Sequence, residues 1–270
     1  MSIAPRRATV LGKYAAIGEV SLKNRLAYRG NFLSGLVTYG LFVFVFSRIW
    51  TAAYSSKASI SGYDYGMSVW YFIVAEVSVF GFGRFFWGLA DDIKSGAVAY
   101  LLGRPYSFVG YHFAEIYGPS LVDAGLYLVE GAVIGILATG LPPSLGVWRL
   151  LALLLSLVVA GALQFFLQMA IAMTAFWVEE NTAFFWIFQK LALVIGTLLP
   201  LEFLPGAVQT AAWCTPLPSL SYAPARIAVA ATPGQAAALI GVQCAWLAAS
   251  ALLCCLLFGA GASKIAIQGG

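Results

Sequence analysis

The chain has 270 residues, of which 61% are hydrophobic and only 10% charged, and its mean hydropathy is +0.87. Soluble globular domains are about half apolar and about a quarter charged, so this composition excludes an ordinary soluble protein and indicates a polytopic membrane protein. The formal net charge of +4 is no sign of a nucleic-acid partner, because Lys and Arg near the ends of membrane spans set orientation instead.

Six apolar stretches are each long enough to cross the bilayer core, which takes about 20 residues. The sequence therefore predicts an all-α membrane protein with six transmembrane helices. We expect a membrane domain at 31–263, between an N-terminal arm at 1–30 and a tail at 264–270. The predicted spans are 31–52, 67–89, 110–139, 147–178, 182–200 and 233–262.

The N-terminal arm is basic and moderately amphipathic. It carries six Lys or Arg residues, and apolar side chains recur every three to four positions at Val10, Tyr14, Ile17 and Val20. This pattern predicts an interfacial helix that lies on the membrane surface in contact with membrane lipids. Its charge favours the anionic cytoplasmic leaflet.

The distribution of basic residues predicts the orientation of the chain. With six spans and both termini cytoplasmic, ten Lys or Arg residues fall on the cytoplasmic side and four on the outer side. Such an excess is typical of cytoplasmic segments. The outer four are Arg48, Lys57, Arg149 and Arg226.

A short charged segment, "DDIKSGAVAYLLGRPYSF" at 91–108, separates the second and third spans. Apolar residues recur there at helical spacing, whereas Asp91, Asp92, Lys94 and Ser95 fall on the opposite face. We expect a cytoplasmic surface helix that Pro105 ends. Such a helix either only connects two spans or docks a soluble partner. The apolar face consists of Phe86, Leu89, Ile93, Ala97, Tyr100 and Leu101.

Residues 200–226 contain five prolines and cannot form one straight helix. We expect short helices that dip into the outer leaflet and turn back, a broken re-entrant segment between the fifth and sixth spans. Irregular backbone of this kind is tolerated at membrane depth only where protein or a wet cavity covers it.

Two motifs together resemble the ABC-2 type permeases. The first is the cytoplasmic segment with Ile93, Lys94, Ser95, Gly96, Leu102, Arg104 and Pro105. The second is "FWVEENTAFFWI", followed by the proline pattern of Pro200, Pro205, Pro216 and Pro224. A basic arm with Arg29 before the first span fits as well, so the resemblance covers nearly the whole chain.

The resemblance implies a permease of a prokaryotic cytoplasmic membrane, which exports a drug, lipid, glycolipid or peptide. It would pair with a second copy or a related permease and bind two ABC ATPase subunits, which hold ATP and magnesium. The chain itself lacks a GxxxxGK[ST] phosphate-binding loop, and no cofactor is expected in it. The segment between spans two and three would be the coupling helix. The coupling residues are then Asp92, Lys94, Ser95, Gly96 and Arg104.

Five ionisable residues fall inside predicted spans, where a charge must face protein or water: Glu76, Glu115, Asp123, Glu130 and Lys190. Asp123 and Glu130 share a helix face to within about 20°. Lys190 lies at a depth similar to Glu115 or Asp123, and either carboxylate is a candidate partner. Three interpretations stay open: polar contacts between helices, a lining for the path of a cationic or amphipathic substrate, or a proton relay.

The sequence contains few residues that would support an enzymatic function. His112 is the only histidine, which excludes a zinc site with two helical histidines, and no nucleophile turn is recognisable. We expect no catalytic or metal-binding residues, and we expect His112 to be an interfacial residue with its hydrogen bonds satisfied. The alternative functions are an ion-coupled secondary transporter and a structural subunit of a larger membrane complex.

Overall fold

The computed structural model describes residues 10–27, 29–83, 85–96, 98, 106–142 and 146–268. Within these ranges the chain forms helices and connecting turns, with one isolated bridge between Ile60 and Tyr63, and this confirms the all-α expectation. The α-helices are α1 Val10–Ala27, α2 Arg29–Ala53, α3 Tyr65–Phe82, α4 Phe86–Lys94, α6 Phe108–Thr139, α7 Val147–Met173, α8 Thr182–Ala192, α9 Gly206–Trp213, α10 Tyr222–Val229 and α11 Pro233–Gln268.

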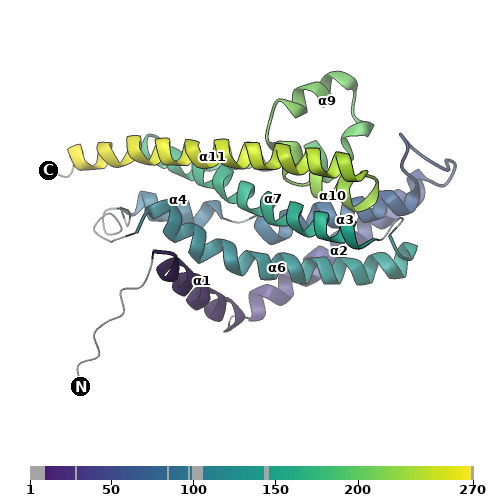
Figure 1. Ribbon diagram of the computed structural model, residues 1–270, viewed down its shortest axis with the longest axis horizontal. Coiled ribbons are helices and arrows are strands. Elements are labelled where there is room, and N and C mark those ends of the chain that lie inside the picture. Colours follow the sequence, from purple (N-terminus) through teal and green to yellow (C-terminus); the bar gives the residue numbers. More distant parts are fainter. Residues whose placement is uncertain are drawn as a thin grey trace.

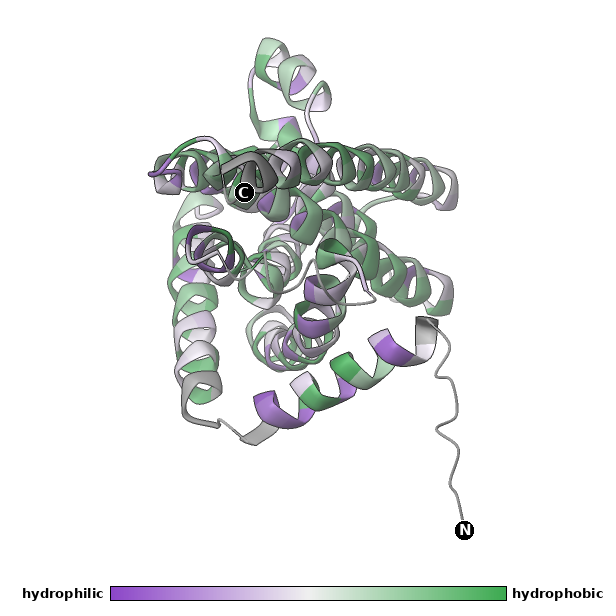
Figure 2. Ribbon diagram, turned by 90° about the vertical axis from the view of Figure 1, so that its left-hand side faces the viewer, coloured by the Kyte–Doolittle hydropathy of each residue, from purple (hydrophilic) through white to green (hydrophobic). Residues whose placement is uncertain are grey.

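The long helices run side by side along the molecule, as Figure 1 shows. Helix α1, helix α4 and the C-terminal end of α11 lie at the same end, on the left of that view. Seen from this end, α1 crosses the bundle rather than running along it (Figure 2). The loop after α2 and the start of α11 lie at the opposite end.

Five helical segments in the described part of the chain are long and apolar enough to cross a membrane, which establishes a multi-pass membrane protein. Helix α3 is the central one, because its side chains are buried on nearly all faces against α2, α6, α7 and α10. The five segments are Leu33–Ala53, Tyr65–Lys94, Phe108–Thr139, Val147–Phe176 and Pro233–Ser263.

The predicted fifth span, 182–200, is not one regular helix. Helix α8 has only 11 residues, and a π-helical turn with a kink at Ile195 and Gly196 follows it. Gly196 has φ +97°, a conformation that side-chain-bearing residues rarely adopt. A β-carbon there would also stand 2.8 Å from that of Tyr222. The close approach of the proline-rich segment therefore accompanies the break.

The predicted second span, 67–89, is also interrupted. Helix α3 ends at Phe82 and α4 begins at Phe86, and residues 83 and 85 in the connection are not helical. The sequence has Gly83 and Arg84 at this point, but the aromatic residues on both sides continue the apolar run, so the run alone does not show the break.

The proline-rich segment is broken into short helices, as the sequence predicts. Two single 3₁₀ turns, Leu201–Phe203 and Leu217–Ser219, alternate with α9 and α10. Helix α10 is buried against α3 and α7, whereas α9 stands away from the bundle beyond α11 (Figure 1).

Candidate functional site

Helix α4 has one buried face and one charged face. Asp91, Lys94 and Ser95 are exposed and Asp92 is half-buried, so the predicted amphipathic pattern is confirmed over this helix. The face that packs on the bundle consists of Phe86, Leu89, Ala90 and Ile93.

The helix ends earlier than predicted. Its last residue is Lys94, and Gly96 takes φ +76°, where a glycine commonly ends a helix. The expectation that one helix continues to Pro105 is therefore wrong, because helical spacing of apolar residues carries no information about a turn at Gly96. Arg104, the last predicted coupling residue, lies outside the described residues.

A buried glutamine holds the break between α3 and α4. Gln168 of α7 accepts hydrogen bonds at Oε1 from the backbone nitrogens of Phe85, at 2.9 Å, and Phe86, at 3.0 Å. Its Nε2 donates to the carbonyl oxygen of Phe82 at 3.1 Å. Gln189 of α8 donates to the carbonyl oxygen of Gly83 at 3.0 Å. These bonds satisfy groups that helix ends leave unpaired, and they attach α4 to α7.

Aromatic rings attach α4 to α8. Phe86 stacks on Phe185 with ring centroids 4.5 Å apart and planes 7° apart. Trp87 meets the edges of Phe185 and Trp186. Helix α4 is therefore in contact with α8 as well as with α7.

His112 connects α4 to α6. Its imidazole is 1% exposed, with Nε2 3.6 Å from Asp92 Oδ2 and Nδ1 3.2 Å from Glu115 Oε2. Neither nitrogen makes a well-aligned hydrogen bond in the described part of the chain. The expectation that the hydrogen bonds of His112 are satisfied is therefore wrong for the described residues. The imidazole does lie beside Asp92, a predicted coupling residue, and the sequence gives no sign of this contact across 20 residues.

The loop between α7 and α8 lies near the charged face of α4. The pKa of the exposed Glu180 is held below its usual value, chiefly because the carboxylate accepts a hydrogen bond from Thr182. The positive charge of Lys94 adds to this lowering, so the two side chains share one surface.

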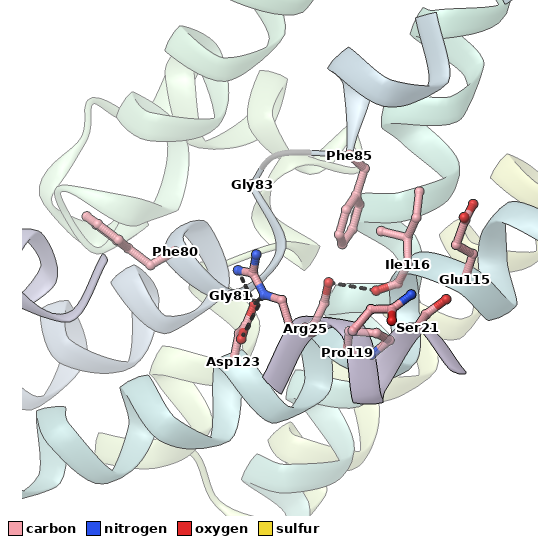
Figure 3. Close-up of a pocket in the computed structure, with 12 residues that line it drawn as sticks. Ser21, Arg25, Phe80, Gly81, Gly83, Phe85, Glu115, Ile116, Pro119 and Asp123 are labelled. Atoms are coloured by element: carbon pink, nitrogen blue, oxygen red, sulfur yellow. Dashed lines mark hydrogen bonds and ion pairs between the residues drawn. The ribbon is translucent and has the colours of Figure 1, made fainter. Parts of the chain in front are cut away.

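A cavity of about 400 Å³ lies beside the break, between α1, α3 and α6. Figure 3 shows Arg25 reaching from α1 to Asp123 of α6 inside it. Their closest atoms, Arg25 Nη2 and Asp123 Oδ2, are 2.7 Å apart, and Arg25 Nε is 3.1 Å from the same oxygen. The other polar lining residues are Ser21, Asn24, Glu115 and Ser120.

A second cavity, of about 490 Å³, adjoins the first. Arg25, Phe80 and Gly83 line both, so the ion pair and the α3–α4 break stand between the two spaces. Polar and apolar groups are mixed in both linings, which suits an amphipathic ligand.

Lys190 does not pair with Glu115 or Asp123, and this expectation is wrong. No carboxylate in the described ranges lies within 4 Å of its amine, which instead stands 5.9 Å from the ring centre of Trp186. Lys190 is exposed on α8 and lines a smaller space of about 160 Å³, which shares Val79, Gly83 and Gln189 with the second cavity. Asp123 takes its cation from the N-terminal helix, because α1 packs along the start of α6.

Glu76 and Glu130 line neither the cavity that contains Asp123 nor the second cavity beside it. Glu76 is 1% exposed within α3, and Glu130 of α6 lies against Gly40 of α2. Each has one buried carboxylate oxygen without a hydrogen-bond partner in the described part of the molecule. The predicted intramembrane residues thus form no single site, although Asp123 and Glu115 do share a cavity.

A polar network at the end of the bundle opposite α4 was not predicted from the sequence. Glu202 accepts hydrogen bonds from the hydroxyls of Tyr63, at 3.1 Å, and Tyr222, at 2.8 Å, and Arg226 Nε lies 3.3 Å from it. Arg226 also donates to the hydroxyl of Tyr63 at 2.9 Å. Burial, and then the charge of Glu202, raise the pKa of both tyrosine hydroxyls, which therefore stay protonated and donate. The network fastens the proline-rich segment to the loop after α2.

Comparison with known proteins places the chain in a family. A search of curated proteins finds no match. The sequence profile of the family described as ABC-2 family transporter protein matches residues 20–269, nearly the whole chain. With several membrane-spanning helices in the structure, the chain belongs to the ABC-2 transporter family.

Proposed function

We propose that this chain is the transmembrane permease subunit of an ATP-driven exporter. The observation that carries the proposal is the arrangement of α4, whose apolar face is fastened to the bundle while its charged face is exposed at one end. A surface helix fixed in this way transmits a displacement imposed by a soluble partner to α7 and α8. Family membership supports a transmembrane role, and the sequence holds no phosphate-binding loop, so a separate ATPase would supply ATP and magnesium.

The partner would contact the half-buried Asp92 and the exposed Lys94, Ser95 and Gly96, with Arg104 as a further predicted contact. Asp92 is the residue through which force would reach α6, because His112 stands between it and Glu115. Glu180 belongs to the same surface by its proximity to Lys94.

The proposed topology has six crossings with both termini in the cytoplasm of a prokaryotic cell. Helix α1, α4 and the end of α11 share one end of the molecule, which favours an even number of crossings (Figure 1). The apolar helix Thr182–Thr197 would begin the short fifth crossing. The network of Glu202 then lies on the outer side.

The proposed cargo is hydrophobic or amphipathic, such as a drug, lipid, glycolipid or peptide. The two cavities beside the break offer both a charged pair and aromatic surface, and they adjoin the element that would move with ATP binding. A second permease, identical or related, would complete the path.

Co-purification tests the proposal. The tagged chain is isolated in mild detergent from its native host, and the proteins that accompany it are identified by mass spectrometry. The wild type is compared with a D92A/K94A variant and with an E19A/K23A variant, whose exposed acid and base on α1 form a pair of their own. We expect an ABC ATPase with the wild type and the control, and its loss with D92A/K94A.

Two other outcomes would count against the proposal. An ATPase retained by D92A/K94A would contradict the coupling contact and leave the permease role standing. Absence of any ATPase from a folded wild-type preparation would contradict the ATP-driven mechanism and favour an ion-coupled transporter or a structural subunit.

A further inference from the structure

A third cavity lies at the end of the bundle opposite α4. Its volume is about 380 Å³, and it is formed by the second half of α2, the first residue of α3 and the last turns of α6. Its lining consists of Phe44, Ser47, Arg48, Thr51, Tyr65, Ile134, Leu137 and Ala138.

The cavity presents a positive charge without a counter-ion. No carboxylate of the described residues lies within 4 Å of the Arg48 guanidinium, which makes no hydrogen bond there and rests over the ring of Phe44 at 5.2 Å. The acid nearest in the sequence to this lining, Asp64, accepts a hydrogen bond from the backbone nitrogen of Met67 and caps α3. A guanidinium with free donors matches the oxygens of a phosphate.

Tyr65 adds a hydroxyl to the lining. It lies 3.2 Å from Thr51 Oγ1, whose single hydrogen is already donated to a backbone oxygen, so the hydrogen of Tyr65 is available either to Thr51 or to a ligand. The hydroxyls of Ser47 and Thr51 are turned to backbone oxygens, those of Phe44 and Ser47 respectively. Among the described residues of this lining, the Arg48 guanidinium is thus the free donor, and its positive charge selects an anion.

The remaining walls are apolar and open to the surroundings. Leu137 is 82% exposed and Phe44 is 52% exposed. Arg48 stands five residues before the end of α2 at Ala53, about 7.5 Å along the helix. In a helix that crosses a membrane, this depth is where headgroup phosphates meet acyl chains.

We propose that this cavity binds the phosphate of an anionic phospholipid in the leaflet at that end of the bundle. Arg48 donates to the phosphate oxygens, the Tyr65 hydroxyl turns from Thr51 to donate to them as well, and the acyl chains lie along Phe44, Leu137 and Ile134. An anionic headgroup is favoured over phosphatidylcholine or phosphatidylethanolamine, because no carboxylate lines the cavity to receive their cationic group. The bound lipid would join α2 to the end of α6.

Lipid binding to delipidated protein in detergent tests the proposal, with native mass spectrometry to count bound lipids and thermal unfolding to follow stability. The probes are phosphatidylglycerol, phosphatidylcholine and inorganic phosphate. We expect phosphatidylglycerol to bind wild-type protein at least about tenfold more tightly than phosphatidylcholine, and R48Q to lose that preference. R48K should keep part of it, because lysine retains the charge without the planar fork.

The matched control is K57Q, which removes an exposed positive charge from the loop after α2 and should bind phosphatidylglycerol like the wild type. Equal binding of the two lipids, or an unchanged preference in R48Q, would overturn the proposal. Equal stabilisation by inorganic phosphate at the same concentration would also overturn it, since the site would then be one for a free anion. A Y65F variant gives an independent measure if R48Q fails to fold, and it should weaken phosphatidylglycerol binding severalfold.

Discussion

The side-chain oxygen of Gln168 lies 2.9 Å from the backbone nitrogen of Phe85, at the point where α3 gives way to α4. The same side chain also bonds Phe82 and Phe86, so one buried residue of α7 satisfies both ends of the break. A helix break in a membrane protein has no water to satisfy its backbone groups and needs such a partner. Gln168 is therefore the residue that fixes the angle between α3 and α4.

Replacing Gln168 by leucine should destabilise the protein by about 2–4 kcal/mol, because three buried backbone groups lose their partner. Thermal unfolding in detergent measures this loss. In the proposed complex with an ATPase, the same change should lower the transport rate more than it lowers ATP binding to the ATPase, because α4 would no longer move with α7.

Gln164 provides the control, because it lies one turn earlier on the same helix, is buried, and makes no hydrogen bond with the described residues. Q164L should therefore be close to neutral. If Q168L and Q164L unfold at the same temperature, the hydrogen bonds of Gln168 do not stabilise the break.

The ion pair of Arg25 and Asp123 should anchor α1 to the bundle. R25A leaves the carboxylate of Asp123, 11% exposed, without its cation and should cost about 1.5–3 kcal/mol. D123N should cost less, because the Arg25 side chain is 42% exposed and can turn to water. Double-mutant cycles by thermal unfolding give the coupling energy.

The exposed pair of Lys23 and Glu19 on the same helix gives the comparison. K23A should leave the stability close to that of the wild type, as is usual for solvated ion pairs. A coupling energy for Arg25 and Asp123 no larger than the effect of K23A would show that the pair in the cavity does not hold α1.

The parts of the fold that could be predicted from sequence are those set by local pattern. Apolar runs of about 20 residues predict membrane spans, and the spacing of Phe86, Leu89 and Ile93 predicts the buried face of α4. The breaks at Gly83 and Gly196 could not be predicted in the same way. Each depends on a partner distant in sequence, Gln168 for the first and Tyr222 for the second.

The candidate site shows the same limit. Helical periodicity correctly places charged residues on the outer face of α4, yet it cannot identify partners across helices. Depth in the membrane alone suggested Lys190 as the cation for Asp123, whereas Arg25 of the N-terminal helix occupies that place. Glu202 was not singled out among the prolines, because its function depends on Tyr63 and Tyr222 folding onto it.

Lys190 should contribute little to stability. Its contact is with the ring of Trp186, and such an exposed cation–π contact is worth about 0.5–1 kcal/mol. K190L should therefore unfold within about 1 kcal/mol of the wild type. If K190L is strongly destabilised and a second change, E115Q or D123N, restores its stability, Lys190 pairs with that carboxylate rather than with the ring of Trp186.

The network of Glu202 should hold the proline-rich segment in place. Y222F removes a 2.8 Å hydrogen bond to the carboxylate and should cost about 1.5–3 kcal/mol. E202Q should cost more, because Arg226, 22% exposed, then loses its counter-ion.

Since burial raises the pKa of Tyr63 and Tyr222, the contribution of these two hydroxyls to stability is complete below the ordinary tyrosine pKa of about 10 and is lost as the pH rises above it. Alkaline unfolding of Y63F/Y222F should accordingly be less steep than that of the wild type. Y106F is the control, because the hydroxyl of Tyr106 makes no hydrogen bond in the described part of the chain, and its alkaline profile should match the wild type. Identical profiles for all three proteins would mean that the network does not secure this segment.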